Sequence, residues 1–228
     1  IVFASGNKYC NRCGHTEVAS THVKKESMVN LSDIEQLPFR DLVDRRIGVD
    51  TCKHFKVRVG LSEANGEVFE HYYPITKEGK TIAYKKRTLP KSFSSLGEAK
   101  GAVDFFGQAT CPKGGKRLLI TGGELDAMSA WQMLKEKYPQ YTPAVVSLPK
   151  GENPSSVKDN IAFINSFDEV IIYTDMDEVG RKVADDIAKL VGPKAKIMKT
   201  SEKDASDMLT KGKKTEFISA YYDAETRK

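Results

Sequence analysis

Carboxylates follow two short aliphatic runs of the sequence, in an arrangement that suits metal binding. Glu124 and Asp126 come after the first run, and Asp175 and Asp177 come after the second. An aliphatic run that ends in acids and then enters a helical pattern predicts a buried parallel strand with acids at its carboxyl end. Open α/β sheets bind ligands beyond those ends. Two acidic edges facing one crevice favour a hard divalent cation, above all Mg²⁺, which leaves positions open for phosphate oxygens.

The two acidic pairs differ in how they can reach a metal ion. Asp175 and Asp177 are alternate residues at a predicted strand end, so both carboxylates can point the same way; the alternative is a solvated acidic loop. Glu124 and Asp126 do not share a helix face, and both reach one metal only if the glycine turn before them stays open. The alternative for Glu124 is a first-turn acid that interacts with the helix dipole.

Longer motifs surround these acids: GGELDAM at 122–128, VVSL at 145–148, DMDEVGRK at 175–182 and KDASD at 203–207. Together they resemble the toprim domain shared by primases, topoisomerases and some nucleases. The closer resemblance is to the primase half of bacteriophage primase-helicases, the family related to mitochondrial Twinkle. It covers most of the chain, and DMDEVGRK is its most specific part.

The resemblance implies a DNA primase that makes short RNA primers from ribonucleoside triphosphates on single-stranded DNA. Two Mg²⁺ ions, or Mn²⁺ in their place, would be held by Glu124, Asp126, Asp175 and Asp177, with Asp204 as a further ligand or else a turn aspartate. Such ions activate the primer 3′-hydroxyl and neutralise the pyrophosphate leaving group. The resemblance also implies an attached helicase domain in the full-length protein. That domain is not in this sequence, which has no GxxxxGK[ST] phosphate loop.

One position departs from the family pattern Thr-Glu-Gly-Glu-x-Asp. Gly122 stands directly after Thr121, where the family has a glutamate that is proposed to act as a general base or metal-site carboxylate. The absence of this glutamate implies a weaker metal site or slower chemistry. It favours a second hypothesis, a catalytically silent toprim module that binds single-stranded DNA for a helicase. A toprim nuclease or topoisomerase is a third hypothesis, against which the basic segment and a cysteine pair argue.

Positive charge gathers in one segment. The net charge is +5, and residues 77–117 hold ten Lys or Arg against three Asp or Glu. Cations beside an acidic metal crevice suit a phosphate-handling enzyme, and the alternative is a solvated basic face. By the resemblance, these basic residues face the toprim crevice and bind nucleoside triphosphate and template. Tyr84 and Phe93 flank them and could stack on bases, although core packing suits Phe93 equally. The candidate nucleotide- and DNA-binding residues are Lys85, Lys86, Arg87, Lys91, Arg181 and Lys182.

Cys10 and Cys13 form a CxxC pair, whereas a zinc ribbon needs two such pairs for four tetrahedral ligands. By the resemblance, this is the second half of a template-reading Zn²⁺ ribbon whose first half lies upstream of Ile1. Completion by His15 or His22, and a pair that binds no metal, are the alternatives. The two other cysteines are expected to be buried apolar residues. Nothing suggests disulfides, which favours a reducing compartment.

The predicted fold class is α/β, α+β overall: a toprim domain with a mostly parallel sheet between helices, after a small antiparallel subdomain and a partial zinc ribbon. The expected divisions are a zinc ribbon at 1–16, a linker at 17–33, a basic subdomain at 34–112, the toprim domain at 113–212, and a helix and linker at 213–228. Predicted strands are 55–59, 68–73, 81–86, 118–121, 144–148, 170–174 and 195–198. Predicted helices are 124–137, 154–166, 178–191 and 214–222.

The sequence predicts a cytoplasmic protein without a membrane anchor. No apolar run approaches the roughly 20 residues that span a bilayer, and no basic stretch precedes an apolar one as in a signal peptide. The sequence begins at Ile1 rather than Met and ends in a charged tail at Lys228. We therefore expect further residues on both sides in the native protein. The template sequence and the oligomeric state cannot be predicted from these residues.

Overall fold

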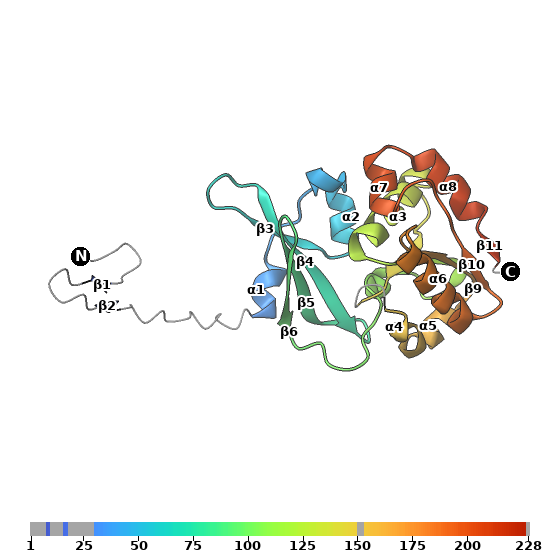
Figure 1. The fold of residues 1–228 in the computed structure, drawn as a ribbon, viewed down its shortest axis with the longest axis horizontal. Helices are drawn as coiled ribbons and strands as arrows, with labels where there is room; N and C mark the ends of the chain where they lie inside the picture. The colour runs from blue at the N-terminus through green and yellow to red at the C-terminus, as the bar shows by residue number, and fades with distance from the viewer. Residues whose placement is uncertain (1–7, 10–15, 18–29, 150–152, 227–228) are drawn as a thin grey trace. The chain divides into compact units, whose positions relative to one another are not determined.

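The computed structural model describes residues 8–9, 16–17, 30–149 and 153–226 (Figure 1). It divides into two compact units, residues 1–30 and residues 31–228. In the first unit, β1 (Lys8–Tyr9) pairs antiparallel with β2 (Thr16–Glu17). The predicted zinc ligands Cys10 and Cys13, with His15 and His22, lie outside the described residues. All further description concerns the second unit.

A four-stranded antiparallel sheet opens the second unit. Its strands follow the order of the chain: β3 (Arg58–Leu61), β4 (Val68–Lys77), β5 (Lys80–Thr88) and β6 (Ser92–Gly97). Glu78 and Gly79 form the turn between β4 and β5. Both residues have positive φ, 50° and 77°, as a tight hairpin turn requires. Their backbone N–H groups donate to the Asp104 carboxylate at 3.1 and 2.9 Å.

The strand predicted at 55–59 is wrong in its first half. The chain enters the sheet through α1 (Leu31–Glu35), a 3₁₀ turn (Val43–Arg45) and α2 (Val49–His54), and β3 begins only at Arg58. Phe55 caps α2, and the Val57 N–H donates to the Cys52 carbonyl at 2.8 Å. Phe55 and Val57 are nevertheless buried. The alternating pattern therefore predicted the burial of Phe55 and Val57 correctly, but it did not distinguish a helix end from a strand.

The parallel sheet has the strand order β11-β10-β9-β7-β8. The parallel strands are β7 (Gly115–Thr121), β8 (Ala144–Ser147), β9 (Phe167–Tyr173) and β10 (Ala195–Ile197). These strands pair in parallel, as predicted, and Thr121 stands level with both Ser147 and Tyr173. The unpredicted β11 (Glu225–Thr226) adds antiparallel to β10. Residues that follow β7 and β9 therefore emerge at one edge of the sheet.

Three long helices match their predicted ranges: α3 (Glu124–Lys137), α6 (Glu178–Val191) and α8 (Lys214–Tyr222). The helix predicted at 154–166 is instead two, α4 (Ser155–Asp159) and α5 (Ile161–Asn165). They part at buried Asn160, whose side-chain amide donates to the Val103 and Ser156 carbonyls at 3.0 and 2.9 Å. A polar side chain bonded to backbone in this way competes with helix continuation. The short helix α7 (Ala205–Thr210) was not predicted.

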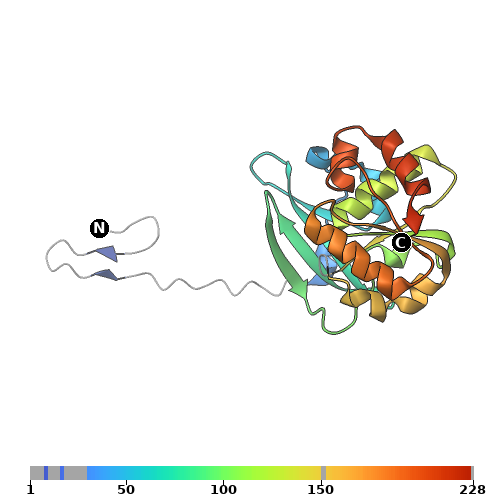
Figure 2. The ribbon, with the colours of Figure 1, turned by 45° about the vertical axis from the view of Figure 1, so that its right-hand side comes forward.

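Helices cover both faces of the parallel sheet, as Figures 1 and 2 show. Leu119 and Ile171 point to the face covered by α3, α7 and α8, whereas Leu118, Ile120 and Val170 point to the face covered by α4, α5 and α6. The strands therefore read as continuous apolar runs because they are buried on both sides. Cys52 and Cys111 are buried free thiols, as expected. Within the described residues, no helix is long and apolar enough to cross a membrane.

One buried histidine makes the stability of the fold depend on pH. His71 of β4 is fully buried; its Nδ1 lies 3.0 Å from the Tyr73 hydroxyl, and its Nε2 has no hydrogen-bond partner among the described residues. Burial, helped by Arg87, lowers its pKa to about 4 from an ordinary value of 6.5. Between those values the unfolded chain binds a proton that the folded chain does not, so stability falls as the pH falls.

We expect His71 to lower the free energy of unfolding by about 2 kcal/mol between pH 7 and pH 5. Urea unfolding of the chain and of His71→Gln at both pH values measures this contribution. The quantity that tests it is the change with pH, because a constant packing defect in the variant cancels. An equal pH dependence in the two proteins would contradict the prediction.

Candidate metal centre at the carboxyl edge of the parallel sheet

Asp126 is the acid whose pKa the other carboxylates at this edge of the sheet raise. It is the third residue of α3, and its Oδ1 accepts a hydrogen bond from the Ser206 N–H at 3.1 Å. Burial, followed by the charges of Asp204, Asp175 and Glu124, raises its pKa to about 8, and the Ser206 hydrogen bond opposes that rise. Burial and neighbouring negative charges both disfavour ionisation of the Asp126 carboxyl group. A divalent cation would relieve that repulsion.

Asp204 reaches this site because α7 begins there. Its carboxylate caps the helix, accepting from the Asp207 N–H at 2.7 Å. Burial raises its pKa, and the hydrogen bond from Asp207 opposes that rise. The same helix start supplies the Ser206 N–H that binds Asp126. The short α7 therefore joins the acid of the KDASD motif to the acid of the GGELDAM motif.

Asp175 follows β9 and forms an ion pair with Lys203, whose Nζ lies 2.9 Å from Oδ2. The Met176 N–H donates to the Lys203 carbonyl at 2.7 Å, which ties the two loops together. A side chain on Gly180 would not fit, because its Cβ would lie 2.2 Å from the Asp175 carbonyl oxygen. The glycine of DMDEVGRK thus lets α6 pack against the backbone that carries Asp175.

Asp177 is placed differently from Asp175. β9 ends at Tyr173, so the alternation expected of a strand does not extend through both acids. The exposed Asp177 caps α6, and its Oδ1 accepts from the Gly180 N–H at 2.9 Å. Asn, Asp and Ser are all effective at such a position. The structure brings Asp126, Asp175 and Asp204 into mutual electrostatic contact, and it gives Asp177 a capping role.

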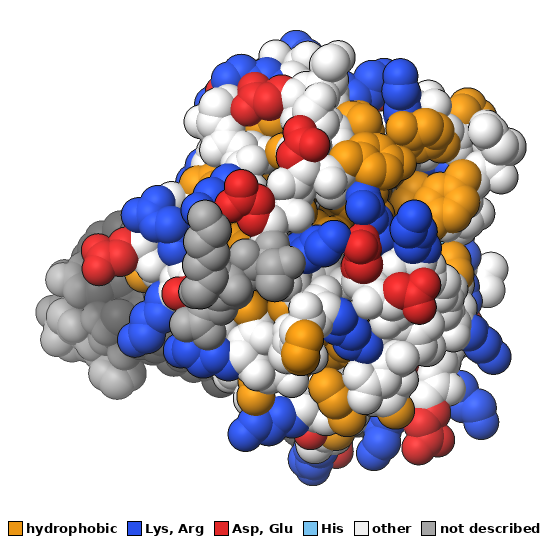
Figure 3. All heavy atoms as spheres, turned by 90° about the vertical axis from the view of Figure 1, so that its right-hand side faces the viewer, with side chains coloured by type: hydrophobic (Ala, Val, Ile, Leu, Met, Phe, Trp, Pro, Cys, Tyr) orange, Lys and Arg blue, Asp and Glu red, His pale blue; other side chains and the backbone are white. Residues whose placement is uncertain are grey.

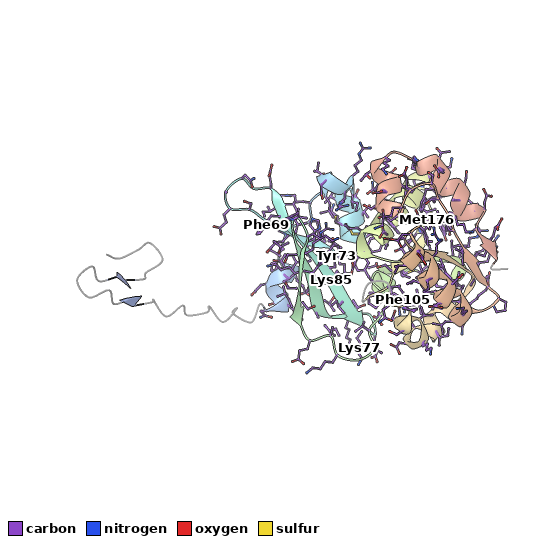
Figure 4. All side chains as sticks on the ribbon, in the orientation of Figure 1. Phe69, Tyr73, Lys77, Lys85, Phe105 and Met176 are labelled. Atoms are coloured by element: carbon purple, nitrogen blue, oxygen red, sulfur yellow. The ribbon has the colours of Figure 1, made fainter. Side chains whose placement is uncertain are left out.

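Glu124 faces the antiparallel sheet. It begins α3, and both of its carboxylate oxygens accept from Lys85 Nζ, at 2.9 and 3.0 Å. Lys85 lies opposite Tyr73 in the β4–β5 pair, and Figure 4 shows Tyr73 and Lys85 together on that sheet. Tyr73, Lys85 and Glu124 line one small pocket with Asp104 and Phe106. No sequence pattern predicts a contact over 39 residues.

The other predicted cations have partners or surroundings different from those of Lys85. Lys86 forms an ion pair with Glu70 and lies on the opposite face of β5 from Lys85, because side chains alternate along a strand. Arg87 is buried and donates from Nη2 to the Pro90 carbonyl at 3.1 Å. Lys91 is exposed. In α6, Arg181 donates to the Met176 carbonyl, and Lys182 is exposed.

The two aromatic residues proposed to stack on bases differ in exposure. Tyr84 is 3% exposed and packs with Ile34 and Tyr72 under α1, so the prediction that it could stack on a base is wrong. Side chains alternate along β5, so Tyr84 points to the face covered by α1, whereas Lys85 points to the other face. Phe93 is 50% exposed, and its ring centroid lies 5.1 Å from Lys85 Nζ. Phe93 therefore remains available next to the Lys85–Glu124 pair.

The chemistry of this donor set fits Mg²⁺, which prefers carboxylate oxygens. The crowding that raises the pKa of Asp126 is the feature that a bound cation would offset. Among the described residues, however, no three acidic, histidine or cysteine side chains are arranged to hold a metal as they stand. Lys85 and Lys203 hold two of the acids. Metal binding therefore requires these lysines to give up their partners.

Replacing Lys85 with methionine should strengthen Mg²⁺ binding. The ammonium competes for Glu124, and a partly exposed ion pair contributes up to about 1 kcal/mol, so we expect about a 5-fold lower Mg²⁺ half-saturation. Calorimetric Mg²⁺ titration measures it. Lys86→Met is the matched control, because Lys86 pairs with Glu70 on the other face of the same strand. Equal affinities in the two variants would exclude Glu124 from the metal site.

Comparisons with known proteins agree with this geometry. Residues 119–209 match the Toprim-like family. The chain is 25% identical over 189 residues to the DNA helicase/primase of Enterobacteria phage T3, a match that covers 82% of this chain and 32% of that protein. The chain thus spans about a third of the length of this relative, and whatever the rest of that protein does lies outside the comparison.

Solved structures show the same fold. The primase fragment of the bacteriophage T7 primase-helicase matches with a TM-score of 0.73 and 22% identity, over 96% of this chain and 92% of that one. T7 primase domains bound to an RNA/DNA hybrid and dTTP match with a TM-score of 0.73 and 24% identity, over 83% and 94%. The Aquifex aeolicus primase gives 0.61 at 13% identity, over 81% and 55%. The predicted toprim fold is confirmed.

Proposed function

Because the chain contains a Toprim-like domain and is homologous to the primase region of a phage helicase/primase, we propose that it is a DNA primase. It would join ribonucleotides on a single-stranded DNA template by metal-dependent nucleotidyl transfer. The observation that carries this proposal is the gathering of Asp126, Asp175 and Asp204 at one edge of the parallel sheet, beside the Lys85–Glu124 pair.

The side chains have complementary tasks in this reaction. Mg²⁺ held by Glu124, Asp126, Asp175 and Asp204 would supply Lewis acidity to the primer 3′-hydroxyl and to the leaving pyrophosphate. Lys85 and Lys203 form ion pairs with carboxylates in the structure. Each ammonium group can instead pair with a phosphate of an incoming nucleotide. Such exchange keeps charge balanced while substrate enters. Partial burial of the acids limits water and strengthens each interaction.

Further parts of the proposal follow from the relatives. The T3 protein is named a helicase/primase, so we propose an attached helicase domain and a cytoplasmic site of action in the infected host. Ribonucleoside triphosphates and single-stranded DNA would be the substrates. Cys10 and Cys13 would contribute to a Zn²⁺ ribbon that reads the template, a hypothesis on residues that the structure does not describe.

A second candidate function rests on Gly122. This buried residue directly follows β7 at the acidic edge, and the family pattern has a glutamate there. A module that keeps the fold and the basic residues while lacking this acid could bind single-stranded DNA without polymerising. The two functions differ in one measurable respect, which is RNA synthesis.

Extension of a short RNA annealed to DNA tests the proposal without depending on template recognition. We expect incorporation of ribonucleotides with Mg²⁺, no incorporation with chelator, and a loss of about 1000-fold in Asp175→Asn, because one ligand of the metal site is removed. Asp168→Asn, at the other end of β9, is the control. Binding of the hybrid without extension in every variant would support the silent module instead.

A further inference from the structure

A second pocket lies at the opposite end of the parallel sheet. It has a volume of about 380 Å³ and is walled by the start of β7, the segment after α3 and the end of α8. The residues that the argument uses are Lys116, Arg117, Tyr138, Tyr141, Tyr221 and Tyr222. Lys116 precedes Thr121 by five strand residues, or about 17 Å. The pocket is therefore remote from the acids that follow β7.

Four tyrosines converge on this pocket. The Tyr138 and Tyr222 rings meet edge to face with centroids 6.3 Å apart, and those of Tyr221 and Tyr222 are 5.2 Å apart. Tyr221 is buried, whereas Tyr141 and Tyr222 are each 48% exposed. Lys135 Nζ holds the loop that carries Tyr141, donating to its carbonyl at 2.9 Å. Two rings are thus presented to solvent on a packed aromatic base.

The charge of the pocket is positive. Lys116 is exposed, and the Arg117 guanidinium lies 5.0 Å from the Tyr222 ring centroid while its Nε pairs with Glu169 at 2.6 Å. Among the described residues, no carboxylate lines the pocket. Figure 3 shows hydrophobic side chains gathered beside lysine and arginine side chains on the face drawn there. Aromatic faces beside the exposed Lys116 and the Arg117 guanidinium suit a ligand that has both a flat ring and a negative charge.

We propose that this pocket binds a nucleobase together with its phosphate. The base would stack on Tyr141 or Tyr222, and the phosphate would interact with Lys116, next to the Arg117 guanidinium. A free nucleotide and one unit of a single-stranded nucleic acid share this chemistry. A protein segment is the other class of ligand for tyrosine-rich pockets, but the positive wall favours the nucleotide. The site needs no metal and stands independently of the proposed primase reaction.

Binding of a fluorescein-labelled octathymidylate in chelator tests the proposal, because the metal centre is then inactive. We expect Tyr141→Ala/Tyr222→Ala to weaken binding about 10-fold, since stacking contributes 1–3 kcal/mol per base. Tyr141→Phe/Tyr222→Phe keeps the rings and should bind like the unchanged chain. Lys116→Glu should weaken binding and lower the salt dependence by about one phosphate contact. Lys158→Glu, an exposed lysine on α4, is the control.

Thymidine monophosphate distinguishes the two sources of the ligand. Displacement of the labelled strand by millimolar nucleotide identifies a mononucleotide site, and no displacement identifies a strand-binding site. If the alanine variant is unstable, photocrosslinking of 5-iododeoxyuridine strands to Tyr141 or Tyr222 of the unchanged chain replaces it. Equal strand affinity in the alanine and phenylalanine variants, or crosslinks only outside this pocket, overturns the proposal and leaves the pocket to a protein partner.

Discussion

Replacing Gly122 with glutamate is expected to raise the rate of RNA extension on a DNA template by about 100-fold. Gly122 directly follows β7, so a carboxylate there would join Asp126 and Asp175 at the same sheet edge. Gly122 is not among the described glycines with positive φ, so its backbone conformation does not require glycine. The family pattern places a glutamate at this position as a base or metal-site acid, and positioned acids and bases contribute 10²–10⁴ in rate.

Gly122→Gln is the matched control for this gain. It has the same size and no charge, so an effect of packing would appear in both variants, whereas an effect of the carboxylate appears only with glutamate. Extension of an RNA already paired with template is the appropriate assay. If the unchanged chain extends RNA as fast as Gly122→Glu, then Glu124 or another acid performs the role. If neither extends it while both bind the hybrid, the chain is a binding module.

The central strands of the parallel sheet were predictable because they are buried on both faces. Leu118, Leu119 and Ile120 are each 0% exposed, so the sequence shows an unbroken aliphatic run that few other structures would tolerate. The acids after such runs follow directly from parallel pairing, which aligns the carboxyl ends. Asp175 and Glu124 were therefore predictable at the correct edge from local sequence.

The remaining parts of the site depend on contacts that local sequence does not encode. β6 escaped prediction because its SFSSLG sequence is polar and mostly exposed, and it pairs only at the edge of the antiparallel sheet. Its placement brings Phe93 beside Lys85. The short α7 has its cap, Asp204, in a motif that also reads as a turn. Which face of β5 carries Lys85 rather than Lys86 is likewise fixed by the partner sheet.

Asp126→Asn is expected to stabilise the chain in chelator by about 2 kcal/mol and to abolish its stabilisation by Mg²⁺. With its pKa raised to about 8 by burial and by Asp204, Asp175 and Glu124, Asp126 binds a proton near neutral pH in the folded chain but not in the unfolded chain. A neutral amide of equal size removes this cost. The Asn carbonyl oxygen can still accept the Ser206 N–H that Oδ1 accepts now. The stabilisation therefore comes with no lost hydrogen bond.

Added Mg²⁺ is expected to close this difference in stability or reverse it. A ligand that binds only the folded chain stabilises it by RT ln(1 + [L]/Kd), about 2.7 kcal/mol at a concentration of 100 Kd. The unchanged chain should gain this amount and the variant should not, so their urea midpoints should approach or cross as Mg²⁺ is added. Ca²⁺-free buffer and a matched ionic strength of NaCl remove general salt effects.

Asp177→Asn is the control that separates a ligand from a capping residue. Asparagine caps a helix as well as aspartate does, and Asp177 is exposed with its Oδ1 on the Gly180 N–H. We expect this variant to match the unchanged chain both in chelator and in Mg²⁺. If it instead loses the Mg²⁺ stabilisation while Asp126→Asn keeps it, the metal lies at the start of α6. The buried acids would then serve to hold α3 against α7, and the chemistry would have to be sought at Asp175 and Asp177.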